Sequence, residues 1–423
     1  MRNSRYGRSR ARVPRLLSFL LRHGAFVAVL ALVIGVVIGA SSGCGNGVAT
    51  VAAEEVDHTP LLQFVGRPLE IEDLDCVSAI VIEPETNTIL FEKNAQERRP
   101  PASIVKMMVE LVVMHEVESG RISLADSVRT SAWASRIGGS QVYLAEGETY
   151  PLEELMKTIA IASANDACVA VAEQIAGSTD GFVAMMNHEA EALGLTNTRY
   201  ENVHGLDDDP TTANRTTAQD IAQLGRALLR FPEVLTWSST PRALFRDGNF
   251  ILENTNKLLG DFPGLDGLKT GYTHQAGFCL CATAQRDELR FLSVVLGCES
   301  NRDRFRTSKE VLGRAFGSYV RYPVCSEGDE LGRLAVVAGK EDSVSVRAPK
   351  DFTLIVSRPD DRYLETRLVP AAEEIVAPLR EGQIVGTLQV KKGDEVLAEM
   401  PVVAAEPVDG GGIASWVRRR IDL

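Results

Sequence analysis

Three short motifs in the chain carry side chains that together could perform acyl transfer at a serine. They are Ser-x-x-Lys at 103–106, Ser-x-Asn at 163–165 and Lys-Thr-Gly at 269–271. Each motif alone arises often by chance. Their occurrence in this order, with 60 and then 106 positions between their first residues, indicates a single catalytic centre.

The first motif supplies a nucleophile and its base. A serine hydroxyl attacks a carbonyl only when a neighbouring group removes its proton. Three positions along a helix place Ser103 and Lys106 side by side. Burial and a second cation, Lys269, would lower the pKa of Lys106 so that its amine can accept that proton. The N–H groups at a helix start would favour negative charge at Ser103.

The other two motifs are predicted to hold the substrate. Ser163 and Asn165 would relay protons and bind the substrate amide. Lys269 and Thr270 would bind an anionic group, and Gly271 would let the substrate lie flat along its strand. Backbone N–H groups near the nucleophile and after the Lys-Thr-Gly strand would form an oxyanion hole.

Alternative explanations of these residues are weaker. Each motif could be only a cap or a strand end, but all three explanations would have to hold together. His115 and His188 each start a pattern like His-Glu-x-x-His that lacks its second histidine, so a zinc peptidase is unsupported. Within residues 54–423 the Gly-x-Ser-x-Gly and phosphate-loop signatures are missing. No metal or organic cofactor is implied, and we expect His204 to be structural.

Hydrophobic patterning predicts an α+β fold in which helices flank an antiparallel sheet. Residues 78–83 and 88–92 are expected to form a hairpin, and Lys-Thr-Gly to lie on an edge strand. Further strands are expected at 277–284 and 290–297. Helices are expected from Ser103 to about Gly120, at 151–162 and at 217–229. After an interruption at 163–165, helical character is expected to resume and continue through Ile175. In the first helix, one apolar face is traced by Val105, Met108, Val109 and Val112.

The length of 423 residues, 45% of them hydrophobic, indicates two or three domains. We expect a basic leader over 1–53 and a catalytic domain over 54–322. A small all-β domain is expected over 325–403, where short strands alternate with turns. An amphipathic tail is expected over 410–423.

The leader predicts export. Residues 1–53 contain seven arginines and no acid, ahead of the apolar run Gly24–Ala40. Arginine on the N-terminal side of such a run places the rest of the chain outside the cytoplasm. Cleavage after Ala53, lipidation at Cys44 and retention as a membrane anchor all stay open.

The charge of the chain indicates which partners it can bind. The formal net charge is −12, which leaves −19 on residues 54–423 and argues against binding to nucleic acid. In the tail, Arg418 and Arg419 lie beside an apolar stripe, so it could lie on an anionic membrane surface. A frayed surface tail is the alternative.

The sequence resembles the serine D-alanyl-D-alanine carboxypeptidases, the low-molecular-mass penicillin-binding proteins. The resemblance spans about residues 70–320, and its clearest segments read ASIVKMM, GGSQVYL, IASANDA, NVHGL and DGLKTGYTHQAGFCL. It implies a β-lactamase/transpeptidase-like fold. It also implies an extracytoplasmic enzyme that removes the terminal D-alanine from peptidoglycan stem peptides and is covalently inhibited by β-lactam antibiotics.

The resemblance also implies roles for individual residues. Ser103 would form the acyl-enzyme and Lys106 would accept its proton. The N–H groups of Ser103 and Tyr272 would make the oxyanion hole. Arg304, within SNRDRF, would lie near the terminal carboxylate of the substrate.

Three alternatives use the same nucleophile. A class A β-lactamase needs a glutamate in Glu-x-x-Leu-Asn, and no glutamate between Asn165 and Lys269 has that context. A peptidoglycan DD-endopeptidase or transpeptidase would differ only in the shape of its groove. A membrane-anchored sensor of β-lactams or wall fragments would keep Ser103 but release no D-alanine.

Overall fold

The computed structural model describes residues 58–207 and 213–412. Its central element is a five-stranded antiparallel sheet with the strand order β3-β2-β10-β9-β8. The strands are β2 (Ser78–Glu83), β3 (Thr88–Lys93), β8 (Leu265–Thr273), β9 (Gly277–Arg286) and β10 (Leu289–Cys298). The antiparallel sheet, its N-terminal hairpin and the edge position of the Lys-Thr-Gly strand are as predicted.

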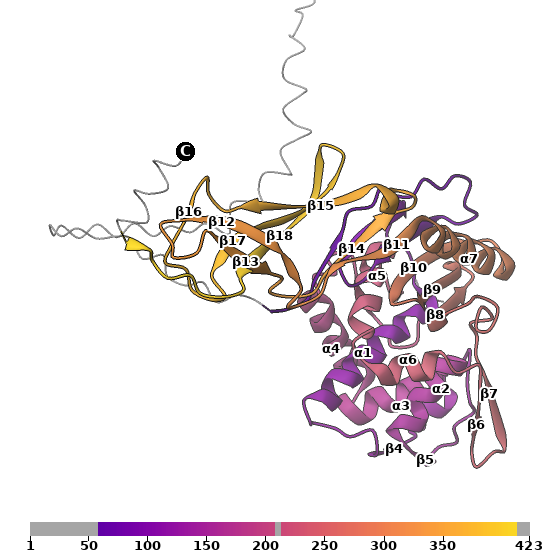
Figure 1. Cartoon of the computed structure of the whole chain (residues 1–423). Helices are drawn as coiled ribbons and strands as arrows, with labels where there is room; N and C mark the ends of the chain where they lie inside the picture. The colour runs from indigo at the N-terminus through magenta and orange to yellow at the C-terminus, as the bar shows by residue number, and fades with distance from the viewer. Residues whose placement is uncertain (1–57, 208–212, 413–423) are drawn as a thin grey trace, which may run out of the picture. The chain divides into compact units, whose positions relative to one another are not determined.

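Both faces of this sheet are covered by helices (Figure 1). All six residues of β2 are buried. Because side chains alternate along a strand, Ile80 and Ile82 face one hydrophobic core while Ala79 and Val81 face the other. Helix α5 packs on the first face and helix α7 on the second.

The helices lie close to their predicted positions, and Thr217 caps α5 by accepting from the Asp220 N–H. Helices α2 and α3 are separated at Ser163 and Ala164, as predicted. The bounds are α1 (Lys106–Glu118), α2 (Leu152–Ala162), α3 (Asn165–Ala176), α4 (Thr179–Ala192), α5 (Ala218–Leu228), α6 (Pro232–Ser238) and α7 (Asn301–Ser318).

The first helix differs from its prediction in two ways. Ser103 lies in a 3₁₀ turn, η1 (Ala102–Val105), and the α-helix begins only at Lys106. The prediction of one apolar face was also incomplete, since every residue from Lys106 to Met114 is buried. A helix that is mostly apolar around its circumference belongs in the interior, so α1 is a central helix.

Short elements complete this part of the chain. Strand β4 (Ser127–Arg129) pairs with β5 (Thr149–Pro151), and β6 (Arg242–Phe245) pairs with β7 (Phe250–Glu253). A 3₁₀ turn, η2 (Ala134–Arg136), lies between β4 and β5 in sequence.

The C-terminal part is rich in strands and has its own core. A six-stranded sheet has the order β15-β17-β18-β13-β12-β16. A second sheet places β1 (Leu61–Phe64) parallel to β14 (Phe352–Ser357), with β11 (Tyr319–Cys325) antiparallel on the other side. The remaining bounds are β12 (Glu330–Val337), β13 (Ser343–Arg347), η3 (Asp360–Tyr363), β15 (Leu364–Pro370), β16 (Ile375–Val376), β17 (Ile384–Lys392) and β18 (Glu395–Ala404).

Strand β11 runs across the predicted boundary between 322 and 325, and the proposed division of the chain remains a prediction. The basic leader with Gly24–Ala40 and Cys44 lies outside the described residues, as does most of the tail from 413 onward. Within 58–207 and 213–412, no helix has the length and hydropathy needed to cross a bilayer.

Candidate active site

The pair Ser103 and Lys106 is brought together by the turn η1. The Lys106 Nζ donates to the Ser103 Oγ at 2.9 Å and to the His204 carbonyl oxygen at 2.7 Å. Lys106 is completely buried, while Ser103 is half-buried. The lysine is therefore held by the His204 carbonyl oxygen and directed at the partly exposed Ser103 hydroxyl.

Burial also changes the charge state of the two lysines. It lowers the pKa of Lys106 to about 8, although acidic neighbours that include Glu110 act in the opposite direction. Burial lowers the pKa of Lys269 to about 7, and the positive charge of Lys106 adds to this effect. Near neutral pH the pair therefore releases a proton easily, as a lysine that serves as a base requires.

The Ser-x-Asn motif lies at the junction of α2 and α3. Ser163 has φ 64° and ψ 35°, the left-handed conformation, which ends α2 and allows α3 to start two residues later. The Asn165 Nδ2 donates to the Gly138 carbonyl oxygen at 2.7 Å. The Ser163 Oγ and Asn165 Oδ1 are buried and have no hydrogen-bond partner among the described residues. Unpartnered buried oxygens of this kind suit a site that gains its partners from substrate.

The Lys-Thr-Gly strand is linked to the Ser-x-Asn region. The Thr270 Oγ1 donates to the Thr255 Oγ1 at 2.7 Å, and the Thr255 N–H donates to the Ile161 carbonyl oxygen at 3.2 Å, two residues before Ser163. Lys269 is 1% exposed, and its Nζ donates to the Thr270 carbonyl oxygen at 3.1 Å. These bonds join the end of α2 to β8.

Two glycines allow the backbone to approach the nucleophile. A Cβ at Gly271 would lie 2.7 Å from the Pro101 carbonyl oxygen and 3.2 Å from the Ser103 nitrogen. Gly205 has φ 89°, and a Cβ there would lie 2.1 Å from the Ala102 carbonyl oxygen. Gly271 was predicted to let the substrate lie flat along its strand. The structure adds a second reason for a glycine at this position, because the turn that carries Ser103 fills the space that a side chain would need.

Tyr272 and Arg304 both lie against the ring of Phe278 on β9. The Tyr272 side chain is 51% exposed and stacks on Phe278, with ring centroids 4.2 Å apart. Arg304 is buried, and its Nη1 donates to the carbonyl oxygens of Gly271 at 3.0 Å and Cys279 at 3.3 Å. Arg304 therefore links β8 to β9 through these two hydrogen bonds. Its contact with a substrate carboxylate remains a prediction.

Glu110, which lies one helical turn after Lys106, was not predicted from the sequence. Its carboxylate is 2% exposed, and Oε1 has no hydrogen-bond partner within the described part of the chain. Burial raises the pKa of Glu110 to about 7, while the charges of Lys269 and Lys106 act to lower it. The side chains of Glu110, Lys106 and Lys269 thus lie together away from solvent, and each affects the titration of the others. The available signal was a lone acid inside the apolar run KMMVELVV.

Asp166, the residue after the Ser-x-Asn motif, was also missed. Its buried carboxylate accepts the Val142 N–H at 3.1 Å, the Leu144 N–H at 3.0 Å and the Ala167 N–H at 3.0 Å. A carboxylate that binds several backbone N–H groups fixes the loop that supplies them. Asp166 therefore holds the 138–144 loop, whose Gly138 carbonyl in turn orients Asn165.

Comparison with known families agrees with this geometry. Residues 65–300 match the family model of D-alanyl-D-alanine carboxypeptidases. The chain belongs to the D-alanyl-D-alanine carboxypeptidase family. Residues 319–409 match the model of the C-terminal domain of penicillin-binding protein 5. The resemblance inferred from the sequence motifs is confirmed.

Curated relatives cover most of the chain. It is 36% identical over 345 residues to D-alanyl-D-alanine carboxypeptidase DacF of Bacillus subtilis, covering 81% of this chain and 88% of that protein. It is 32% identical over 355 residues to DacA of Escherichia coli, covering 81% of this chain and 85% of that protein.

Solved structures agree on the fold. Penicillin-binding protein 5 of Haemophilus influenzae superposes with a TM-score of 0.66 at 28% identity, covering 81% of this chain and 99% of that one. Penicillin-binding protein D2 of Listeria monocytogenes, in its ampicillin-bound form, gives 0.54 at 30% identity and covers 59% of this chain and 100% of that one. The predicted penicillin-binding-protein fold, with a β-rich C-terminal part, is confirmed.

The charge of Glu110 should set the pH at which the serine becomes reactive. Glu110→Gln removes a negative charge that raises the pKa of Lys106, so the proton leaves Lys106 at lower pH. We expect the midpoint of the acid limb of benzylpenicillin acylation to move down by about one pH unit. The measurement is the second-order acylation rate constant as a function of pH.

Glu116→Gln is the matched control on the same helix. Its carboxylate is paired with Arg121 and is not among the groups that shift either lysine. An unchanged midpoint in Glu110→Gln, or an equal change in Glu116→Gln, would contradict the argument.

Proposed function

We propose that this chain is a serine D-alanyl-D-alanine carboxypeptidase that removes the terminal D-alanine from peptidoglycan stem peptides through an acyl-enzyme on Ser103. The observation that carries the proposal is the 2.9 Å contact from the buried Lys106 Nζ to the Ser103 Oγ. Family membership supports the same activity. A β-lactamase, an endopeptidase or a non-catalytic sensor is not favoured by the relatives.

Acylation begins when Lys106 is neutral. Its hydrogen bond to Ser103 then reverses, so that the hydroxyl donates to the amine, and the proton moves to Lys106 as Oγ attacks the carbonyl carbon of the penultimate D-alanine. The oxyanion accepts from the N–H groups of Ser103 and Tyr272. Collapse breaks the amide bond, and the proton passes from Lys106 through Ser163 to the amine of the departing D-alanine.

Substrate binding and hydrolysis use the remaining residues. Lys269 and Thr270 bind the terminal carboxylate, whose negative charge raises the pKa of Lys269 and restores its positive charge. Asn165 binds the substrate amide. Water then attacks the ester and gives its proton to Lys106, and Ser103 is released with its own proton restored.

We also propose an extracytoplasmic location with contact to the membrane. The support is the arginine-rich leader before Gly24–Ala40 and the basic amphipathic tail. Carboxypeptidase activity on stem peptides requires a location where those peptides are exposed. β-Lactam antibiotics are the expected covalent inhibitors, since they mimic the acyl donor and acylate the same serine.

Removing either member of the reactive pair should abolish activity. Ser103→Ala is expected to lose both D-alanine release from a D-Ala-D-Ala peptide and labelling by fluorescent penicillin. Lys106→Ala is expected to lose about 10³-fold in rate, or roughly 4 kcal/mol of transition-state stabilisation. Lys157→Ala, a lysine paired with Glu154 on α2, should keep full activity. Retained labelling in Ser103→Ala would show that another nucleophile reacts.

Penicillin should acylate the protein and leave slowly. The chain lacks the Glu-x-x-Leu-Asn glutamate with which class A β-lactamases activate the deacylating water. Intact-mass measurements after mixing with benzylpenicillin should therefore show a persistent adduct of the whole antibiotic. Hydrolysis of many penicillin molecules per second would instead make the protein a β-lactamase.

The tail should contribute to membrane contact through its arginines. A chain from Glu54 to the C-terminus is expected to sediment with phosphatidylglycerol vesicles and not with neutral phosphatidylcholine vesicles. The double change Arg418→Glu and Arg419→Glu reverses the charge beside the apolar stripe and should abolish sedimentation. If the unchanged protein and the double variant bound the vesicles equally, the arginines of the tail would not contribute to membrane contact.

A further inference from the structure

The hairpin formed by β6 and β7 carries a side chain that the mechanism above does not use. The two strands form a sheet of their own, apart from the central sheet, and pack against α2 (Figure 1). Arg246, in the turn between them, has φ 54°, the left-handed conformation that is unfavourable for a residue with a Cβ. Such a conformation persists only where surrounding contacts determine it, and the Arg246 side chain makes several.

The guanidinium of Arg246 binds one short stretch of chain. Its Nη1 donates to the Val142 carbonyl oxygen at 2.8 Å, and its Nη2 donates to the Tyr143 carbonyl oxygen at 2.6 Å. The same Nη2 donates to the Glu148 Oε2 at 2.8 Å, and Nε donates to the Tyr150 hydroxyl oxygen at 3.2 Å. A planar group with fixed donor directions can satisfy several acceptors at once, which a lysine ammonium on a flexible chain cannot reproduce.

The 138–144 loop, to which the two carbonyl groups belong, lies outside every helix and strand of the described chain. Asp166 accepts two N–H groups of this loop, and Arg246 donates to two of its carbonyl oxygens. Val142 is bound by both side chains, through its N–H and through its carbonyl. The loop backbone is therefore fixed by two groups of opposite charge, one from α3 and one from the β6–β7 hairpin.

The same loop fixes Asn165 of the Ser-x-Asn motif. The Gly138 carbonyl oxygen accepts from the Asn165 Nδ2 at 2.7 Å, and the Ser140 carbonyl oxygen accepts from the Asn165 N–H at 2.7 Å. A Cβ at Gly139 would lie 2.6 Å from the Asn165 Nδ2, so the loop and the amide are in direct contact. A displacement of the loop must therefore move or release the Asn165 amide.

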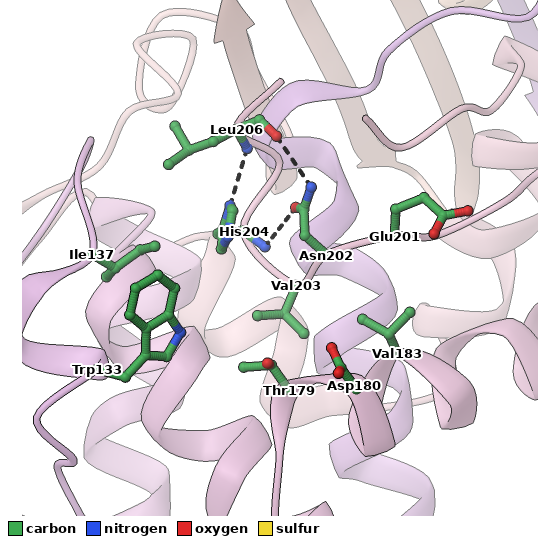
Figure 2. Close-up of a pocket in the computed structure, with 10 residues that line it drawn as sticks. All are labelled: Trp133, Ile137, Thr179, Asp180, Val183, Glu201, Asn202, Val203, His204 and Leu206. Carbon is green, nitrogen blue, oxygen red and sulfur yellow. Dashed lines mark hydrogen bonds between the residues drawn. The ribbon is translucent and has the colours of Figure 1, made fainter. Parts of the chain in front are cut away.

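The start of the loop borders a cavity. Ile137, directly before Gly138, lines a space of about 350 Å³ together with Trp133 and His204 (Figure 2). Atoms that border a cavity lack the contacts that a packed interior would supply. The position of Gly138 therefore depends strongly on the hydrogen bonds made farther along the loop, at 142–148.

The guanidinium of Arg246 is itself held in place by the hairpin. Its Cζ lies 5.4 Å from the ring centroid of Phe245 and 5.9 Å from that of Phe250, distances at which an aromatic ring attracts a cation. Phe245 is buried, and its ring also contacts that of Tyr150. Only 23% of the Arg246 side chain is exposed, so water screens its ion pair with Glu148 incompletely. The hairpin therefore presents the guanidinium to the loop in a defined orientation.

We propose that Arg246 is a positioning residue for acyl transfer, which holds the 138–144 loop so that the Asn165 amide stays directed at the substrate. Arg246 acts through the loop and does not contact the reacting atoms. The inference rests on the proposed function, in which Asn165 binds the substrate amide. It makes the β6–β7 hairpin a support of the active site, although the hairpin contributes no residue to the three motifs.

Single and double substitutions test whether Arg246 acts through Asn165. The readout is the second-order rate constant for acylation by benzylpenicillin. We expect Arg246→Ala to lower this constant about tenfold, because a small displacement of a group that positions substrate is costly. In an Asn165→Ala background the same substitution should change the constant less than about twofold, since the group that it displaces is already absent.

Arg246→Lys separates position from charge. The lysine keeps a positive charge beside Glu148 but cannot bind both carbonyl oxygens, so we expect the variant to fold and still to lose most of the same rate. It is made in both backgrounds, so that the test holds even where Arg246→Ala does not fold. Arg242→Ala is the matched control on β6, because Arg242 is exposed and pairs only with Glu253 among the described residues, at 2.6 Å. This control should leave the rate constant unchanged, and thermal unfolding of every variant shows which are folded.

The outcomes separate this inference from the proposed function. If benzylpenicillin does not acylate the unmodified protein, the proposed nucleophile is wrong. If Arg246→Lys is acylated as fast as the unmodified protein, or if a substitution at Arg246 lowers the constant equally in both backgrounds, the inference is wrong. Release of D-alanine from a D-Ala-D-Ala peptide is measured with the same variants. Acylation without release would overturn the carboxypeptidase activity and leave the positioning of Asn165 standing.

Discussion

The removal of the Lys106 amine from water is the constraint on which the rest of the site depends. A charged ammonium in the interior costs folding free energy, and the chain reduces this cost by lowering the pKa of Lys106 to about 8 and by offering two acceptors, the Ser103 Oγ and the His204 carbonyl. Glu110 compensates part of the charge from within the same helix. The burial of α1 around its circumference therefore lowers the pKa of Lys106 in addition to packing the core.

Two residues in the left-handed conformation and two glycines allow the reactive segments to approach Lys106. Ala102 has φ 49° and Ser163 has φ 64°, and a non-glycine residue in this conformation costs of order 1–3 kcal/mol. Gly205 and Gly271 let two other segments contact the backbone beside Ser103. Asp166 then fixes the loop that orients Asn165. Such strain persists only where the surrounding core determines the geometry, and the two helix-covered faces of the sheet supply that core.

Local patterns in the sequence determined much of this protein. The antiparallel hairpins, the break between α2 and α3, the edge strand and the three motifs all follow from residues within about ten positions of one another, where propensity and spacing act directly. The family resemblance followed from the same motifs. The sequence also placed Ser103 beside Lys106, because three positions of a helical turn need no tertiary contact.

Only the tertiary structure decided what burial and distant contacts do to these groups. The pairing of β1 with β14 joins strands nearly 300 residues apart, and the contact of Gly271 with Pro101 joins the motif strand to the turn of the nucleophile. The coupling of Glu110 to Lys269, which lies on a different element, likewise has no local signature. Desolvation and charge coupling depend on what surrounds a side chain in space, and that is set by the packing of the whole chain rather than by its neighbours in sequence.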